Sequence, residues 1–181
     1  MRAGVYTATP RQFYTANASL PRTLFLAAGG FREALNRAED IELAHRLADN
    51  GVEFLFLPEA AVVHIPERSF DSWLGTAYEY GRAAVIFERE LGRPYLQAAY
   101  EEWSARHPLN RAAARACVGS AIASQGAIRT TRLLLSLPAW VVPGRMRAAA
   151  CAAVYNIKYW QGIADASGLG SAVWSASMAR A

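Results

Sequence analysis

Cysteine and histidine are few in this sequence, with two and three residues, and they stand far apart. The two cysteines, Cys117 and Cys151, each lie in an alanine-rich segment, so we expect reduced thiols in a core rather than a disulfide. No zinc-ligand spacing and no alternation of aromatic with basic residues is present, and the net charge is only +4. We therefore expect no nucleic-acid partner.

Long apolar runs and a secretion signal are also missing. The longest apolar run, residues 133–142, is interrupted by Ser136 and Pro138 and is shorter than the roughly 18 residues of a membrane-spanning helix. Residues 1–10 lack the apolar centre of a signal peptide. What the sequence does contain is apolar material, 53% of 181 residues, which is enough for a buried core and excludes a disordered chain.

Hydrophobic periodicity and turn residues predict where helices and strands lie. Glycine pairs and Asn-Gly pairs mark the ends of helices, and proline marks the ends of strands. The elements expected in the first zone of the chain are helices over 19–28 and 39–49, a buried strand over 54–57 and a second strand over 60–64. An amphipathic helix is expected over 69–92, and the alanine- and arginine-rich residues 94–160 are expected to be helical.

The first zone also holds an ordered series of polar and glycine residues. In chain order these are Asn17-Ala-Ser-Leu-Pro-Arg22, Gly29-Gly30-Phe31, the acidic pair Glu39-Asp40 and, after a predicted strand, His64. Over residues 13–66 this series resembles the second half of the catalytic domain of family 2 glycosyltransferases, which have the GT-A fold. The resemblance implies an α/β fold class: the C-terminal half of a GT-A (nucleotide-diphospho-sugar transferase) domain, followed by amphipathic α-helices.

The resemblance also implies a division of the chain and of its functions. Residues 1–66 would be the acceptor-side half of the domain, 67–165 a helical extension and 166–181 a flexible tail. The reaction would be an inverting transfer from a nucleotide-sugar donor to a hydroxyl of a glycan or lipid-linked acceptor, as in polysaccharide biosynthesis. This places the protein in the cytoplasm, peripheral to the inner membrane surface.

Inverting transfer needs a base that takes the proton of the attacking hydroxyl, and a carboxylate can serve. By the resemblance this base is Asp40, with Glu39 beside it in the acceptor site. The implied donor- and acceptor-binding residues are Asn17, Arg22, Gly29, Gly30 and Phe31. His64 would complete the coordination of a divalent metal, Mg or Mn, whose main ligands belong to a D-x-D motif that this sequence lacks.

Each of these residues also has a purely structural interpretation. Acidic residues such as Glu39 and Asp40 are favoured in the first turn of any helix. Paired glycines commonly end a helix, and a histidine after a strand is usually held by hydrogen bonds. Arg22 and Arg46 would then pair with Glu33 or Glu42 as a solvated network.

The donor-binding part of such an enzyme is not recognisable in this sequence. A truncated gene product, a fragment of a longer enzyme and a split enzyme with a partner chain all remain open, and the first two are favoured. We expect the chain to be inactive by itself. A Q-x-x-R-W motif, typical of processive synthases in the family, is also missing, which favours the addition of a single sugar.

Residues 129–147 combine apolar residues with a tryptophan and arginines, a composition suited to a lipid interface. An apolar helix face follows, formed by Met146, Ala149, Ala150, Ala153, Val154, Ile157 and Trp160. Two interpretations are open, peripheral contact with a membrane and packing of these helices on one another. The alternative to an enzyme is therefore a non-enzymatic helical module that docks on a membrane surface or a partner protein.

Overall fold

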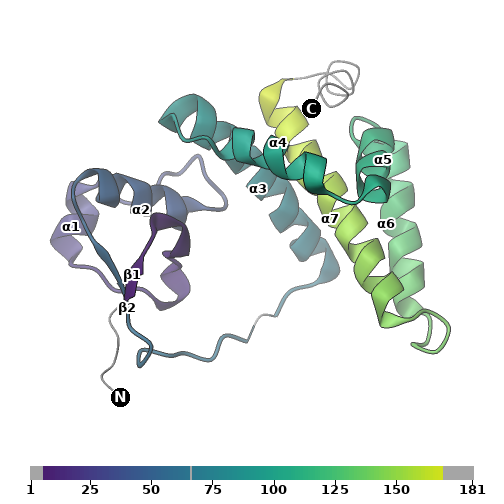
Figure 1. The fold of residues 1–181 in the computed structure, drawn as a ribbon, viewed down its shortest axis with the longest axis horizontal. Helices are drawn as coiled ribbons and strands as arrows, with labels where there is room; N and C mark the ends of the chain where they lie inside the picture. Colours follow the sequence, from purple (N-terminus) through teal and green to yellow (C-terminus); the bar gives the residue numbers. More distant parts are fainter. Residues whose placement is uncertain (1–5, 66, 169–181) are drawn as a thin grey trace. The chain divides into compact units, whose positions relative to one another are not determined.

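A computed structural model describes residues 6–65 and 67–168 of the chain (Figure 1). The chain forms two compact units, Met1–Glu67 and Arg68–Ala181. Each unit has its own elements and its own buried core.

Unit 1 combines short helices with a small sheet (Figure 1). Its elements in chain order are β1 (Tyr6–Ala8), the 3-10 turns η1 (Pro10–Gln12) and η2 (Thr15–Asn17), α1 (Arg22–Ala27), α2 (Glu39–Asp49) and β2 (Phe54–Phe56). The two strands pair antiparallel, with Tyr6 opposite Phe56. Helix α2 ends as predicted, at Asn50 and a left-handed Gly51.

The core of unit 1 forms where α2 meets turn η1 and the start of strand β2. Leu43, Ala44 and Leu47 lie on one face of α2 at helical spacing and are buried. Phe13 and Phe54 complete the cluster and contact each other edge to face, with ring centroids 5.5 Å apart. This packing fixes the axis of α2, and therefore the position of its N-terminus.

The predicted α/β fold class is wrong. Helices make up most of the described chain, and the sheet formed by the described residues has only the two three-residue strands β1 and β2. The strand expected over 60–64 is not formed: residues 61–65 are irregular, and Val63 is 89% exposed. The strand over 54–56 is formed but not buried, because a sheet of two strands gives neither face a full cover.

Unit 2 is entirely helical where it is described (Figure 1). Its helices are α3 (Phe70–Leu91), α4 (Tyr95–Ala105), α5 (Pro108–Cys117), α6 (Ala121–Ser136) and α7 (Gly144–Ser167). The predicted amphipathic helix is confirmed as α3: Ser69 caps its N-terminus by accepting from the Ser72 amide at 3.1 Å, and Gly92 ends it in a left-handed conformation. The tail expected over 166–181 begins inside α7, and its residues 169–181 lie outside the described part.

Helices α3 and α7 cross through a pair of glycines. A Cβ added to Gly81 would lie 2.0 Å from the backbone oxygen of Tyr159, and one added to Gly162 would lie 2.0 Å from that of Tyr78. The two backbones therefore touch, and each glycine leaves the room that the other helix occupies. The Tyr78 hydroxyl donates to Asp165 at 2.9 Å beside this crossing.

The rest of the unit 2 core surrounds two tryptophans. Trp103 of α4 and Trp160 of α7 are both buried and meet edge to face, with ring centroids 4.8 Å apart. The apolar face expected on α7 is divided: Val154, Ile157 and Trp160 are buried in unit 2, whereas Met146 is half exposed. Within the described residues, no helix has both the length and the apolar character needed to cross a bilayer.

Tyr159, next to the glycine crossing, makes the stability of unit 2 depend on pH. Burial, with a smaller contribution from Glu102, raises the pKa of Tyr159 from 10.0 to about 12. The phenol therefore ionises more easily in the unfolded chain than in the folded one. Its contribution to stability is complete below pH 10 and is lost as pH rises toward 12.

We accordingly expect the free energy of unfolding of unit 2 to fall between pH 10 and pH 12, and the Tyr159→Phe variant to lose part of that fall. The rest comes from Tyr78, Tyr100 and Tyr155, whose pKa values are also raised by burial. Urea titrations followed by tryptophan fluorescence measure it, because all five tryptophans of the sequence follow residue 67. Tyr14→Phe, at an exposed tyrosine of unit 1, is the matched control. Equal pH dependence in the Tyr159→Phe variant and the natural chain would contradict this account.

Candidate functional site

The candidate site is built on the first turn of α2, where three carboxylates gather. Glu39, Asp40 and Glu42 all lie in this turn, where the helix dipole favours negative charge. The residue before them, Ala38, has φ 63° and is the only described non-glycine residue with a positive φ. That conformation costs an alanine about 1–2 kcal/mol. Strained backbone of this kind is common beside functional residues.

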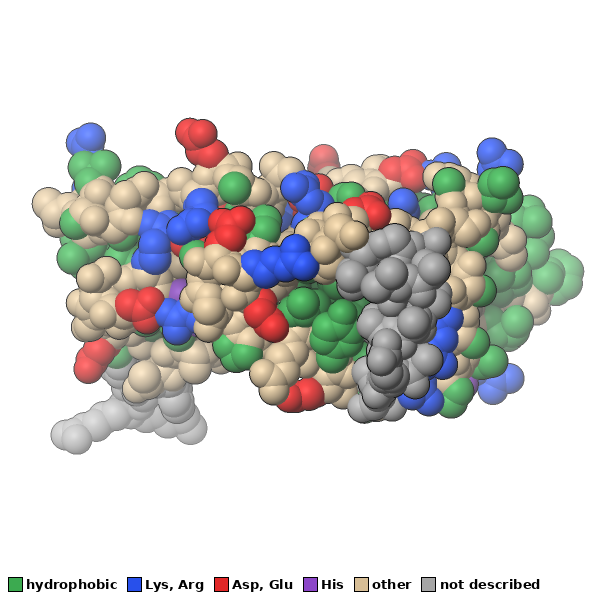
Figure 2. All heavy atoms as spheres, turned by 90° about the horizontal axis from the view of Figure 1, so that it is seen from above, with side chains coloured by type: hydrophobic (Ala, Val, Ile, Leu, Met, Phe, Trp, Pro, Cys, Tyr) green, Lys and Arg blue, Asp and Glu red, His purple; other side chains and the backbone are tan. Residues whose placement is uncertain are grey.

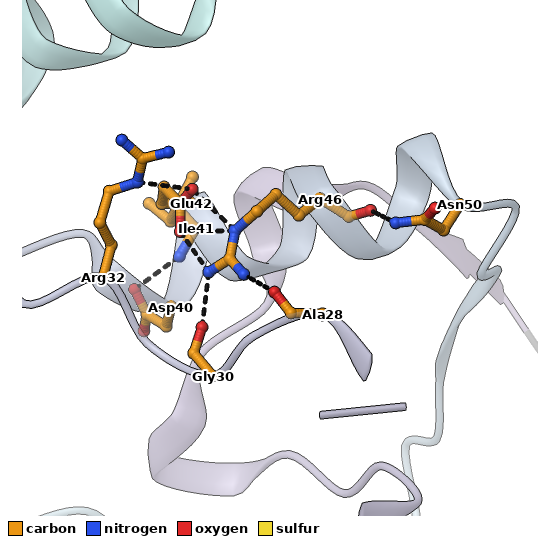
Figure 3. A network of polar contacts seen from close by, with 8 residues as sticks. All are labelled: Ala28, Gly30, Arg32, Asp40, Ile41, Glu42, Arg46 and Asn50. Atoms are coloured by element: carbon orange, nitrogen blue, oxygen red, sulfur yellow. Dashed lines mark hydrogen bonds and ion pairs between the residues drawn. The ribbon is translucent and has the colours of Figure 1, made fainter. Parts of the chain in front are cut away.

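Asp40 is held in place by backbone amides. One carboxylate oxygen accepts from the N–H of Ile41 at 2.9 Å (Figure 3). The other accepts a longer bond from the N–H of Thr15 at 3.4 Å. The side chain is half buried, so a hydroxyl group can still approach it. Glu39, directly before it, is also half buried. The arrangement fits both a positioned base and a carboxylate that satisfies the start of its helix.

Glu42, two residues further along the same turn, is the buried charge of unit 1. Its side chain is 0% exposed and accepts from Arg46 Nε at 2.8 Å and Arg46 Nη2 at 2.6 Å. Arg32 adds a third nitrogen, 3.4 Å from the carboxylate. The predicted pairing of Arg46 with Glu42 is confirmed, but it is not a solvated pair: Glu42 is fully buried and Arg46 is only 25% exposed. A buried carboxylate needs such partners because its desolvation costs several kcal/mol.

Arg46 also joins α2 to the glycine loop, Gly29-Gly30, that follows α1. Its guanidinium donates to the carbonyl oxygen of Gly30 at 2.6 Å and to that of Ala28 (Figure 3). One arginine thus binds the glycine loop and the carboxylate of Glu42, two residues after Asp40. The geometry uses the planar, forked donor set of arginine, which a lysine cannot reproduce.

Gly29 and Gly30 end α1 in left-handed conformations, with φ of 83° and 71°. The Gly30 N–H donates to Phe25 O at 3.0 Å, so the structural interpretation of a helix stop is confirmed. A Cβ would meet nothing closer than 3.8 Å at Gly29 and 3.4 Å at Gly30. Glycine is therefore required here by the backbone conformation and not by a close contact inside the unit.

The other residues predicted to bind donor or acceptor are Phe31, Arg22 and Asn17. Phe31 is half exposed and packs edge to face on Phe25, with centroids 5.2 Å apart. Arg22 is the first residue of α1 and is exposed. Asn17 donates from Nδ2 to Ala60 O at 2.6 Å and so ties turn η2 to the segment after β2.

His64 is not brought to the acidic pair. It lies on the exposed segment 61–65, and no hydrogen bond or ion pair joins it to Asp40. Over residues 6–65 and 67–168, no group of three or more His, Cys, Asp or Glu side chains is placed to hold a metal ion. The described residues by themselves therefore complete no divalent metal site, and no chemical step is assigned to a metal.

The sequence-based prediction missed Glu42 as the centre of the site. The available signal was its spacing of four residues from Arg46, which indicates an ion pair but not its burial. Comparison with protein-family models, with curated proteins and with solved structures gives no match. The resemblance to family 2 glycosyltransferases thus depends on the residues of unit 1 alone.

Proposed function

We propose that unit 1 supplies the acceptor-side residues of an inverting glycosyltransferase, which uses a nucleoside diphosphate sugar as donor and a glycan or lipid-linked hydroxyl as acceptor. The observation that carries the proposal is the placement of Asp40. Its carboxylate is half buried and oriented by backbone amides at the helix end, where Arg46 anchors the Gly29-Gly30 loop. The proposal depends on these residues and not on the α/β fold class, which was wrongly predicted.

The chemistry requires one proton transfer and one displacement. Asp40 takes the proton of the acceptor hydroxyl while that oxygen forms a bond to the anomeric carbon of the donor sugar. The bond from this carbon to the diphosphate breaks, and the electron pair leaves with the nucleoside diphosphate. Glu39, next to Asp40, orients the acceptor by accepting a hydrogen bond from a second hydroxyl.

The donor must be held by a part of the enzyme that the described residues do not form. Unit 1 contributes the carboxylates and the glycine loop, and the rest of a catalytic assembly contributes the nucleotide site. The chain by itself is then expected to leave nucleotide sugars unchanged. A test of the proposal therefore needs the whole assembly.

In cells that carry the gene, replacing Asp40 with Asn is expected to lower sugar transfer by about 10²–10⁴-fold, because the base is removed while the shape of the side chain is kept. Extracts are supplied with a panel of labelled nucleotide sugars, and labelled glycan and lipid products are measured. Labelling of the assembly by a photoreactive donor analogue should persist. Asp49→Asn, at the other end of the same helix, is the control.

Sugar transfer by the Asp40→Asn variant within about twofold of the natural chain would remove Asp40 from the mechanism, since loss of a general base costs far more. If the variant loses both donor labelling and sugar transfer, the assembly is damaged instead. Circular dichroism of the purified variant separates these outcomes, because an unchanged spectrum places the defect in chemistry.

A further inference from the structure

The turn between α6 and α7, residues 137–143, presents apolar side chains at one end of unit 2. Trp140 at its tip is 86% exposed, and Val141 beside it is also exposed. Leu133, before the turn, and Met146, after it, are exposed as well. A large apolar ring is strongly stabilised by burial, yet Trp140 is left exposed and does not contribute to the core of the unit.

The turn that carries Trp140 is held from inside by one arginine. Arg147 of α7 donates from Nε to Val142 O at 3.1 Å and from Nη1 to Leu135 O at 3.2 Å, and its Nη2 donates to Leu137 O. Within the turn, the side chain of Val142 is buried. Three carbonyl groups are thus fixed by one guanidinium, and Trp140 is displayed on an ordered turn.

The sequence around this turn is basic, although one of its arginines, Arg132, is paired with Asp71 of α3. Between residues 103 and 164 the sequence has eight Lys or Arg residues and no Asp or Glu. Arg129 and Arg145, on the two helices that flank the turn, are exposed. Figure 2, which is seen from above, shows green and blue side chains at the right-hand end of the view, where Figure 1 has α5 and the upper end of α6; the turn lies on the far side of that view.

We propose that the α6–α7 turn docks on the surface of an anionic lipid bilayer. Trp140, Val141, Leu133 and Met146 enter the interface between headgroups and acyl chains, and the arginines meet the phosphates. The mostly aliphatic character of the exposed side chains favours lipid over nucleic acid, which needs aromatic rings for base stacking. The inference concerns unit 2 and is independent of the function proposed for unit 1.

Flotation of the full chain with lipid vesicles tests the inference. We expect binding to vesicles of phosphatidylcholine and phosphatidylglycerol in equal parts, and at least about tenfold weaker binding to pure phosphatidylcholine. Added salt should weaken the binding by screening the arginines. Trp140→Ala is expected to weaken it by about tenfold, and Arg129→Gln and Arg145→Gln by about fivefold each.

The matched control is Ile122→Ala, which removes an apolar side chain 88% exposed at the opposite end of α6 and should leave binding unchanged. Equal binding to neutral and anionic vesicles would overturn the proposal, as would equal losses in the Trp140 and Ile122 variants. It would also be overturned if the chain bound no vesicles but formed a dimer that Trp140→Ala dissociates, because the turn would then bind a second copy.

Discussion

The Gly81→Ala variant is expected to lose about 3 kcal/mol of the folding free energy of unit 2, or more. Its new Cβ would lie 2.0 Å from the backbone oxygen of Tyr159, and no side-chain rotation can relieve a contact with backbone. Helices α3 and α7 must separate, and the contacts of Trp73 with Tyr155 and of Tyr78 with Asp165 are disturbed with them. For a unit of this size, the melting temperature should fall by roughly 10–20 °C.

Gly75→Ala is the matched control on the same helix. Gly75 is exposed, and nothing lies within 4 Å of an added Cβ, so alanine should stabilise α3 by about 0.5–1 kcal/mol. Thermal unfolding followed by tryptophan fluorescence compares the two variants in unit 2 alone. Similar melting temperatures for both would show that the helices do not cross at Gly81.

A double variant tests whether the two glycines form one contact. Once Gly81→Ala has moved the helices apart, Gly162→Ala should cost much less than it does alone. Additive losses would mean that the two positions act independently and would contradict the reciprocal contact between the helix backbones.

The Arg46→Ala variant is expected to destabilise unit 1 by about 3–5 kcal/mol. It leaves the Glu42 carboxylate fully buried with only Arg32 at 3.4 Å, and it releases the carbonyl groups of Ala28 and Gly30. Arg46→Lys should recover only part of the loss, because one ammonium group cannot reach both carbonyls and the carboxylate. Hydrogen exchange of the α2 amides, followed by mass spectrometry, measures the effect within unit 1.

Arg106→Ala serves as the control, because its partner Glu102 is 70% exposed and such surface pairs contribute at most about 1 kcal/mol. The tryptophan fluorescence of the Arg46→Ala variant should be unchanged, since the tryptophans all follow residue 67. If α2 exchanges no faster in this variant than in the natural chain, Arg46 does not hold the site together.

The helices with strong end signals could be predicted from the sequence. Asn50 and Gly51 mark the end of α2, and Ser69 and Gly92 enclose α3, because capping and left-handed residues act locally. The strand over 60–64 was wrongly predicted because β-propensity reflects the packing of a strand on its neighbours. Those residues pair with no strand among the described elements.

The centre of the candidate site depends on contacts distant in sequence. The position of Asp40 in a helix first turn followed from the residues around it, as did the C-terminal end of α1; the start of α1 was predicted at residue 19, whereas the helix begins at Arg22. The burial of Glu42 did not, because it depends on the loop at Ala28 and Gly30 folding onto Arg46 from more than fifteen residues away. The meeting of Gly81 with Gly162 likewise depends on the register of two helices far apart in the chain.

The exposed segment 61–65 is expected to affect how the purified chain aggregates. Val62, Val63 and Ile65 are β-branched, uncharged and open to solvent, which is the composition of segments that form intermolecular β-structure. Crowding of many copies brings such segments into register with one another. Aggregation in concentrated solution would therefore begin in unit 1 at this short segment, while the helices of unit 2 are still folded.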